Sequence, residues 1–350
     1  MQTAPIAAET ARTIATTLAR LAPDYGATPL LDLPLLAARL GVAQVLAKNE
    51  AGRMLGSFKS LGGTYAGLRA LARAARTDIA GLIAARPAGQ PALLCASDGN
   101  HGLAVAAAAR FAGAGARVYL HRGVPEIRAR RIADQDAELR WVNGTYDDAV
   151  DAAAEAARTG AGILVADTTD DPNDPVVRDV MAGYGVMAGE IRDQAAASGQ
   201  ASPTHLFVQA GVGGLAAAMA DGLAGWLAAP RAIVLIEPEA APAVAAALAR
   251  GRPVRVAGDL RTAAEMLSCG EASAPALAVL RRYPVEVRAV PEAMLRAAPA
   301  LLAACGGPRT TPSGAAGLAG VMAARDRRAG PGPDARILIL VTEAGIEDAA

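Results

Sequence analysis

Lys59 is the residue whose side chain is best suited to covalent chemistry. It is one of only two lysines, the other being Lys48, in a chain that has 34 lysines and arginines together. An arginine keeps its charge at any usable pH, whereas a lysine amine can lose its proton and attack a carbonyl carbon. Lys59 precedes a glycine pair at 62–63 and a segment with apolar residues at helical spacing. We interpret Lys59 as a Schiff-base lysine; the alternative is an ordinary surface lysine.

A second polar segment, residues 97–102, follows a predicted strand at 92–96 and opens a predicted helix. Free amides at a helix start bind anions such as a carboxylate, with help from the helix dipole. Asn100 can donate a hydrogen bond to a ring hydroxyl, and Asp98 adds a carboxylate. The alternative is an ordinary helix cap formed by Ser97 or Asp98.

A glycine-rich segment, residues 211–216, follows a predicted strand at 205–209 and also opens a helix. Glycines let the backbone approach a phosphate, and the helix start supplies amides. The segment also fits the dinucleotide pattern Gly-x-Gly-x-x-Ala, and Glu237 ends the next strand about 20 residues on, as that pattern expects. The segment predicts a phosphate site and leaves open which phosphate it binds.

Two further predicted strands lead into single polar residues, Asp167 and Thr342. Asp167 could act as a base, an ammonium binder or a metal ligand, or it could lie in a solvated turn, as we expect for Asp170 and Asp171. The Thr342 hydroxyl could bond a cofactor ring nitrogen, which would then stay unprotonated. Its alternative is a hydroxyl bonded to the backbone.

The elements that must position these residues alternate regularly. Apolar strands followed by alanine-rich helices predict an α/β fold of mostly parallel twisted sheets flanked by helices, and 350 residues suit two such sheets. Ligands in such folds bind beyond the carboxyl ends of the strands. Strands are predicted at 44–48, 92–96, 117–120, 139–142, 162–166, 205–209, 232–237 and 336–342. Helices are predicted at 9–21, 35–40, 60–76, 101–111, 126–135, 146–158, 176–197 and 215–227.

Composition excludes several classes of function. The formal net charge is zero and 19% of residues are charged, so nothing favours nucleic acid or an anionic membrane as a partner. The most apolar stretch, 206–229, contains polar residues and glycines, and we expect it in the core. The N-terminus lacks the pattern of a signal peptide.

Cysteine and histidine usage indicates neither disulfides nor a metal site. An odd, widely spaced set of cysteines argues against a disulfide framework or a zinc site and fits a reducing cytoplasm. The three histidines lack ligand spacing. The cysteines are Cys95, Cys269 and Cys305.

Taken together, the polar segments match one cofactor. Pyridoxal phosphate needs a lysine for an imine, a phosphate site, a donor to its 3′-oxygen and a partner for its ring nitrogen. Lys59, the glycine segment, Asn100 and Thr342 offer these four contacts. A dinucleotide enzyme would have no need of Lys59.

The chain resembles the fold-type II pyridoxal-phosphate enzymes, which include tryptophan synthase β and threonine dehydratase, and among them the diaminopropionate ammonia-lyases. The resemblance spans roughly residues 27–345. Asp98 discriminates within it, because serine and threonine dehydratases usually carry a small neutral residue there. The motifs that carry the resemblance are Arg53 with 58–63, 98–102, 209–213, 237–238, 269–271, 313–315 and 342–343.

The resemblance implies an architecture and a set of site residues. Residues 1–55 and 163–350 would form a large domain that binds the cofactor phosphate, and 56–162 a small mobile domain, in a homodimer. Lys59 would form the Schiff base, Asn100 would bond the 3′-oxygen, and Thr342 would meet the ring nitrogen. The phosphate would lie on Gly211, Val212, Gly213, Gly214 and Leu215. The small amino-acid substrate would contact Ser97, Asp98, Gly99, His101 and Asp167.

The implied reaction is αβ-elimination of 2,3-diaminopropionate, or a close β-substituted amino acid, to pyruvate and ammonia. The catalytic residues would be Lys59, Asp98 and Asp167, with either aspartate or Lys59 as the base. A carboxylate beside a β-ammonium group stabilises its charge and orients it.

Two departures from the family pattern leave alternatives open. Pro312 stands where the family usually has a glutamate, and 168–183 lacks the usual aromatic residues. One alternative is an L-serine or L-threonine dehydratase. A second is an NAD(P)-binding oxidoreductase that uses the glycine segment, and a third is a catalytically inactive relative.

Overall fold

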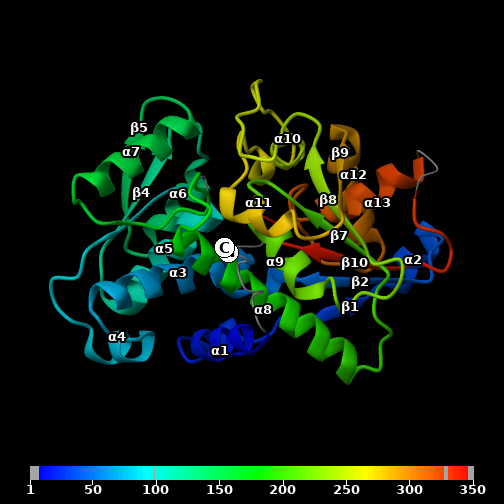
Figure 1. Ribbon diagram of the computed structural model, residues 1–350, viewed down its shortest axis with the longest axis horizontal. Helices are drawn as coiled ribbons and strands as arrows, with labels where there is room; N and C mark the ends of the chain where they lie inside the picture. The colour runs from blue at the N-terminus through cyan, green and yellow to red at the C-terminus, as the bar shows by residue number, and fades with distance from the viewer. Residues whose placement is uncertain (1–7, 98, 327–329, 346–350) are drawn as a thin grey trace.

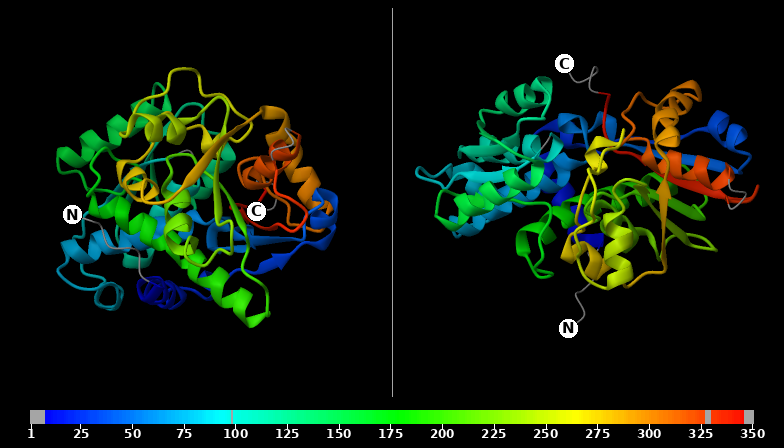
Figure 2. Two further views of the ribbon diagram at one scale, coloured as in Figure 1. Left: turned by 45° about the vertical axis from the view of Figure 1, so that its right-hand side comes forward. Right: turned by 90° about the horizontal axis from the view of Figure 1, so that it is seen from above.

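The computed structural model describes residues 8–97, 99–326 and 330–345. Its strands form two sheets, which lie on opposite sides of the molecule (Figures 1 and 2). The six-stranded sheet has the order β1 (Leu30–Asp32), β2 (Gln44–Asn49), β10 (Arg336–Val341), β7 (His205–Gln209), β8 (Ala232–Pro238) and β9 (Val285–Val290). The four-stranded sheet has the order β5 (Glu138–Val142), β4 (Ala116–His121), β3 (Leu93–Ala96) and β6 (Ile163–Leu164).

Parallel pairing dominates both sheets, which confirms the α/β prediction. The strands of the described chain pair in parallel except for β1, which runs antiparallel to β2. The helices are α1 (Ala8–Ala19), α2 (Pro34–Leu40), α3 (Lys59–Ala74), α4 (Ile79–Ala85), α5 (Asn100–Ala112), α6 (Glu126–Ala133), α7 (Tyr146–Arg158), α8 (Pro175–Ala197), α9 (Gly214–Leu223), α10 (Ala243–Arg250), α11 (Ala274–Leu280), α12 (Glu292–Ala304) and α13 (Ala316–Asp326).

The six-stranded sheet is buried on both faces, which explains why its central strands are continuous apolar runs. Along β10, Ile337 and Ile339 face one core, which they share with α2, α12 and α13. Leu338 and Leu340 face the other core, which continues past α8 into the four-stranded sheet. This alternation follows from the two-residue period of a strand.

Helices α3 and α8 join the two sheets through a close crossing of glycines. A Cβ at Gly62 would lie 2.6 Å from the Val180 carbonyl oxygen, and one at Gly183 would lie 2.6 Å from that of Leu61. The two backbones can approach this closely only because glycine occupies both positions. The crossing brings α8 against the start of α3, where Lys59 lies.

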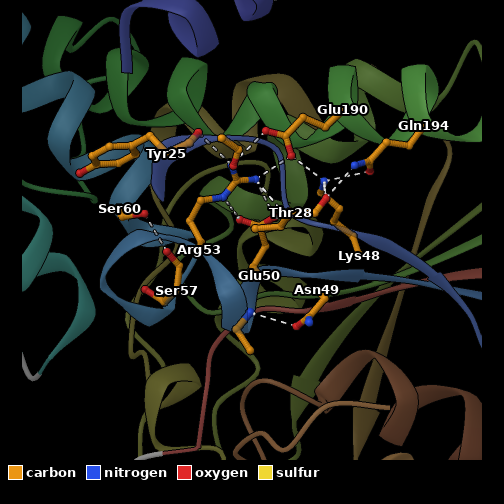
Figure 3. Close-up of polar contacts among 12 residues, drawn as sticks. Tyr25, Thr28, Lys48, Asn49, Glu50, Arg53, Ser57, Ser60, Glu190 and Gln194 are labelled. Carbon is orange, nitrogen blue, oxygen red and sulfur yellow. Dashed lines mark hydrogen bonds and ion pairs between the residues drawn. The ribbon is translucent and has the colours of Figure 1, made fainter. Parts of the chain in front are cut away.

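A buried ionic cluster anchors the segment that leads to Lys59 (Figure 3). The Arg53 guanidinium makes paired bonds to Glu50, both at 2.8 Å, and to Glu190, at 2.6 and 3.0 Å. Lys48 lies 2.5 Å from Glu190 and donates to the Thr28 carbonyl at 2.6 Å. Lys48 is therefore a structural lysine, fully buried and ion-paired.

Several elements differ from those expected. The predictions omitted strands β1 and β9 and helices α4 and α10–α13, and they extended the helix at 215–227 beyond Leu223, where α9 ends. The domain boundary expected between residues 162 and 163 falls just before β6. This strand pairs with β3, so it belongs to the four-stranded sheet on the other side of that boundary. None of the described helices combines the length and apolarity that crossing a bilayer requires.

Candidate active site

The site residues proposed from the sequence line one cavity between the two sheets. Except for Lys59, which begins α3, they reach it from the carboxyl ends of β3, β6, β7 and β10, as expected for parallel sheets. Asp98 lies outside the described residues. The others that line the cavity are Lys59, Ser97, Gly99, Asn100, His101, Asp167, Gly211, Val212, Gly213, Gly214, Leu215 and Thr342.

Lys59 and Asp167 form an ion pair inside this cavity. The Lys59 Nζ donates to Asp167 Oδ2, and both side chains are largely buried. Burial alone would lower the pKa of Lys59, but the Asp167 carboxylate outweighs it and holds that pKa above its ordinary value. Burial likewise opposes ionisation of Asp167, and the Lys59 ammonium holds the pKa of that carboxyl below its ordinary value. Asp167 is therefore a buried carboxylate, whereas Asp170 and Asp171 are exposed.

His101 presents an unprotonated ring nitrogen to the interior. Its Nε2 lies 2.8 Å from the Val165 carbonyl oxygen, which can only accept, so Nε2 carries the hydrogen. Burial lowers the pKa of His101, so the ring is neutral. The remaining nitrogen, Nδ1, is buried and has no hydrogen-bond partner among the described residues.

Tyr184, which the sequence analysis did not select, places a hydroxyl beside Lys59. The Tyr184 ring packs 4.8 Å from that of Phe58, and a Cβ at Gly62 would lie 2.3 Å from it. Its hydroxyl is buried without a hydrogen-bond partner among the described residues. Burial raises the pKa of Tyr184 to about 12, against the Lys59 ammonium, which lowers it. Buried polar groups without partners are rare in proteins, so His101 and Tyr184 suit a polar ligand.

Asn100 is held by a carboxylate that was also not selected from the sequence. Its Nδ2 donates to Glu343 Oε2, and Thr311 donates to Glu343 Oε1. Burial raises the pKa of Glu343, against these two bonds, which lower it. Glu343 directly follows Thr342, just after the end of β10, and the sequence analysis named it only as part of the motif 342–343.

The glycine segment forms a tight turn into α9. Gly213 has a φ of +94°, a left-handed conformation that favours glycine. A Cβ at Gly211 would lie 2.9 Å from the Cys269 sulfur. The Val212 carbonyl accepts from the Ser273 amide at 2.9 Å, which anchors the turn. A glycine-rich backbone turn before a helix N-terminus is a cradle that fits a phosphate.

Glu237 is not available to bind a ribose, as the acidic residue of a dinucleotide site would have to. Its carboxylate accepts from the amides of Val244 at 2.6 Å and Ala245 at 2.9 Å, at the start of α10. Burial raises the pKa of Glu237 to about 7, against these bonds. The Glu237 carboxylate therefore accepts hydrogen bonds from the N-terminus of α10 and does not face the cavity. No group of acidic, histidine and cysteine residues in the described ranges could hold a metal ion.

The lysine, the glycine cradle and the unpartnered polar atoms of one cavity fit a phosphorylated, carbonyl-bearing cofactor. A family model described as pyridoxal-phosphate dependent enzyme matches residues 21–343. The chain belongs to this family. Its cofactor is pyridoxal phosphate.

Known proteins similar to this chain include ammonia-lyases and dehydratases. The diaminopropionate ammonia-lyase of Salmonella typhimurium is 35% identical over 265 residues, which cover 71% of this chain and 65% of that protein. The structure of the holo diaminopropionate ammonia lyase from Escherichia coli matches with a TM-score of 0.87 at 26% identity, covering 99% of this chain and 92% of that one. A biosynthetic L-threonine dehydratase of Corynebacterium glutamicum is 33% identical, covering 69% of this chain and 50% of that protein.

Proposed function

We propose that this protein is an ammonia-lyase that converts 2,3-diaminopropionate, or a close β-substituted amino acid, into pyruvate and ammonia. The observation that carries this proposal is the buried Asp167 carboxylate, paired with an ammonium group in the cavity. A substrate with two ammonium groups offers a replacement for that partner. The similarity to diaminopropionate ammonia-lyases supports the same substrate class.

The cofactor would be held by residues at the ends of both sheets. We propose that Lys59 binds its carbonyl carbon, Asn100 its 3′-oxygen and Thr342 its ring nitrogen. When bound, pyridoxal phosphate supplies an electron sink for negative charge at the substrate Cα. The phosphate would lie on the amides of Gly211, Val212, Gly213, Gly214 and Leu215.

Asp167 is proposed to change its role when Lys59 binds the cofactor. The Lys59 nitrogen, once bonded to the cofactor carbon, keeps at most one hydrogen, so it stabilises the Asp167 carboxylate less strongly and the pKa of Asp167 rises. A carboxylate with a raised pKa is a better base, and it also attracts a substrate ammonium. Asp167 would thus take the Cα proton or hold the β-ammonium as it leaves, with Lys59 as the alternative base.

Asp98 is proposed as the second acid on the strength of the sequence. Its neighbours Ser97 and Gly99 line the cavity, and Gly99 N donates to Ser97 Oγ at 3.1 Å. With Asp98, the start of α5 would offer amides to the substrate carboxylate and an acid to an ammonium. Ser97, Gly99 and His101 are the proposed carboxylate contacts.

We also propose that residues 56–162 move as a small domain against 1–55 and 163–350. Polar contacts between the two parts include Arg128 with Glu265 at 2.6 Å, Arg255 with Asp147 at 3.2 Å, and Asn100 with Glu343. These three contacts can form and break without repacking a core, whereas the crossing of α3 with α8 and the pairing of β3 with β6 also join the two parts and would limit the movement. The proposed setting is a cytoplasmic homodimer, as the resemblance implies.

A dehydratase acting on L-serine or L-threonine is the second candidate, favoured by the similarity to threonine dehydratase. The two functions differ in their need for acid groups. Purified protein is mixed with 2,3-diaminopropionate, L-serine or L-threonine, and the 2-oxo acid is measured. We expect the highest kcat/KM for diaminopropionate and its loss in Asp98→Ala. A higher value for L-threonine, unchanged in Asp98→Ala, would establish the dehydratase instead.

A further inference from the structure

Gln209, the last residue of β7, lines the cavity but belongs to none of the roles above. Its side chain is buried, and its amide nitrogen Nε2 lies within hydrogen-bond distance of four oxygens. Three are the carbonyl oxygens of Ser313 at 3.1 Å, Gly314 at 3.1 Å and Leu340 at 3.3 Å. The fourth is the hydroxyl oxygen of Thr342, at 3.0 Å.

The three carbonyls determine which way the Gln209 amide faces. Carbonyl oxygens only accept hydrogen bonds, so the NH₂ group must point at them. Rotating the amide by half a turn would place its own oxygen against three other oxygens. The Gln209 oxygen Oε1 is accordingly buried with no partner among the described residues. Leaving such an acceptor unpaired destabilises the fold, so this glutamine contributes through its N–H donors.

The orientation of Gln209 determines the polarity of the Thr342 hydroxyl. An amide NH₂ cannot accept, so the contact between them is N–H to Oγ1. Within the described part of the chain, this hydroxyl accepts that bond and donates none. Its hydrogen is therefore free to point into the cavity, which Thr342 lines.

We propose that Gln209 is a positioning residue that makes Thr342 a hydrogen-bond donor to the cofactor ring nitrogen and so keeps that nitrogen unprotonated. This inference rests on the proposed contact between Thr342 and the ring nitrogen. A nitrogen whose lone pair accepts a hydroxyl hydrogen cannot bind a proton at the same place. Gln209 would thereby tune the electron demand of the cofactor without touching it.

The test uses the holoenzyme loaded with pyridoxal phosphate that carries ¹⁵N in its ring. The ¹⁵N chemical shift reports directly whether the ring nitrogen is protonated, hydrogen-bonded or free. It is measured for wild type, Gln209→Leu, Thr342→Val and the double variant, together with the dissociation constant of the cofactor. Gln194→Leu is the matched control, since Gln194 contacts Thr28 in the buried ionic cluster, outside the cavity.

Wild type should show an unprotonated, hydrogen-bonded nitrogen, and Gln209→Leu should move the shift toward that of Thr342→Val. Loss of one hydrogen bond should weaken cofactor binding about tenfold. In the Thr342→Val background, Gln209→Leu should change neither quantity further. If Gln209→Leu does not fold, Gln209→Glu keeps the shape, and its carboxylate would accept the Thr342 hydrogen and produce the same shift.

Two results would overturn the proposal. One is a wild-type ring nitrogen that is protonated; the other is a ¹⁵N shift in both Gln209 variants that equals that of wild type and of Gln194→Leu. Because this readout needs only the bound cofactor, it is independent of the substrate. Wild type that binds the cofactor but forms no pyruvate would refute the proposed reaction and leave this test intact.

Discussion

Lys59 and Asp167 hold each other in their charged forms inside the cavity between the two sheets. The pKa of Lys59 lies above its ordinary value because of the Asp167 carboxylate, and that of Asp167 lies below its own because of the Lys59 ammonium. The pair joins the first residue of α3 to the segment after β6. A ligand that bonds covalently to the Lys59 nitrogen must therefore first displace a proton from the Lys59 ammonium, which the Asp167 carboxylate stabilises.

Lys59→Ala should abolish both the visible absorbance of the bound cofactor and lyase activity, because no other amine lines the described cavity. The measurement is an absorbance spectrum after reconstitution with pyridoxal phosphate. Lys48→Met is the control: it removes the other lysine and should keep the visible band, although it breaks a buried ion pair and lowers stability. A band that persists in Lys59→Ala would refute the assignment.

Asp167→Asn should lower the pKa of Lys59, since burial then acts on that amine without an opposing carboxylate. Removing an opposite charge at this distance changes a pKa by about one to three units. The rate of cofactor binding should thus reach its plateau at correspondingly lower pH, while kcat falls about 10²–10⁴-fold. Asp170→Asn is the matched control, because Asp170 is exposed in the same segment. An unchanged pH profile in Asp167→Asn would contradict the coupling.

The same pair should make stability depend on pH in acid. The folded-state pKa of Asp167 is depressed, so its stabilisation is present above the unfolded value of about 4 and is lost as the pH falls further. Urea unfolding of cofactor-free wild type and cofactor-free Asp167→Asn checks this. Their difference in unfolding free energy should shrink between pH 6 and pH 3; a constant difference would refute it.

Arg53→Ala should destabilise the protein by about 3–5 kcal/mol, because it leaves the buried Glu50 carboxylate without its ion-pair partner and removes one of two partners from Glu190. The Arg53 side chain has no exposed area, and Glu50 and Glu190 both bind it. Arg158→Ala is the control: its pair with Glu155 is exposed, and its loss should cost at most about 0.5 kcal/mol. Equal effects in urea unfolding would mean that the cluster contributes no more than a surface pair.

Gly62→Ala should destabilise the fold by about 1–3 kcal/mol by overpacking the crossing of α3 and α8. The added methyl group would lie 2.6 Å from the Val180 carbonyl oxygen and would press on Tyr184. Gly189→Ala in α8 is the control, since its nearest neighbour would lie 4.0 Å away. Helix propensity predicts no loss there and up to about 1 kcal/mol of gain. Thermal unfolding of both variants distinguishes the two cases.

Much of the fold could be predicted because local signals were strong. Strands such as β7 and β10 are continuous apolar runs, and each ends at a segment whose polar or glycine residues reach the cavity. By contrast, β9 alternates Val with Glu286 and Arg288, as an edge strand does, and lacks a continuous apolar run. The helix α12 contains Pro299, which obscured its periodicity.

The missing parts of the site depend on contacts between distant segments. Tyr184 reaches Lys59 only because Gly62 and Gly183 let two helices cross closely, and no local pattern encodes that crossing. Glu343 meets Asn100 across 243 positions of sequence. The Gln209 amide is oriented by backbone carbonyl oxygens of two other segments, at Ser313 and at Leu340. Residue type and strand position indicated the cofactor contacts, whereas tertiary packing determines the groups that orient them.

The stoichiometry of ammonia to pyruvate is the most direct test of the proposed reaction. αβ-Elimination from 2,3-diaminopropionate releases the β-nitrogen first and the α-nitrogen on hydrolysis, so two molecules of ammonia should accompany each pyruvate. Wild-type holoenzyme is incubated with diaminopropionate, and both products are measured over time. We predict a constant ratio of two, with neither product formed by Lys59→Ala. Absence of pyruvate from cofactor-loaded wild type, or one ammonia per pyruvate, would contradict the account.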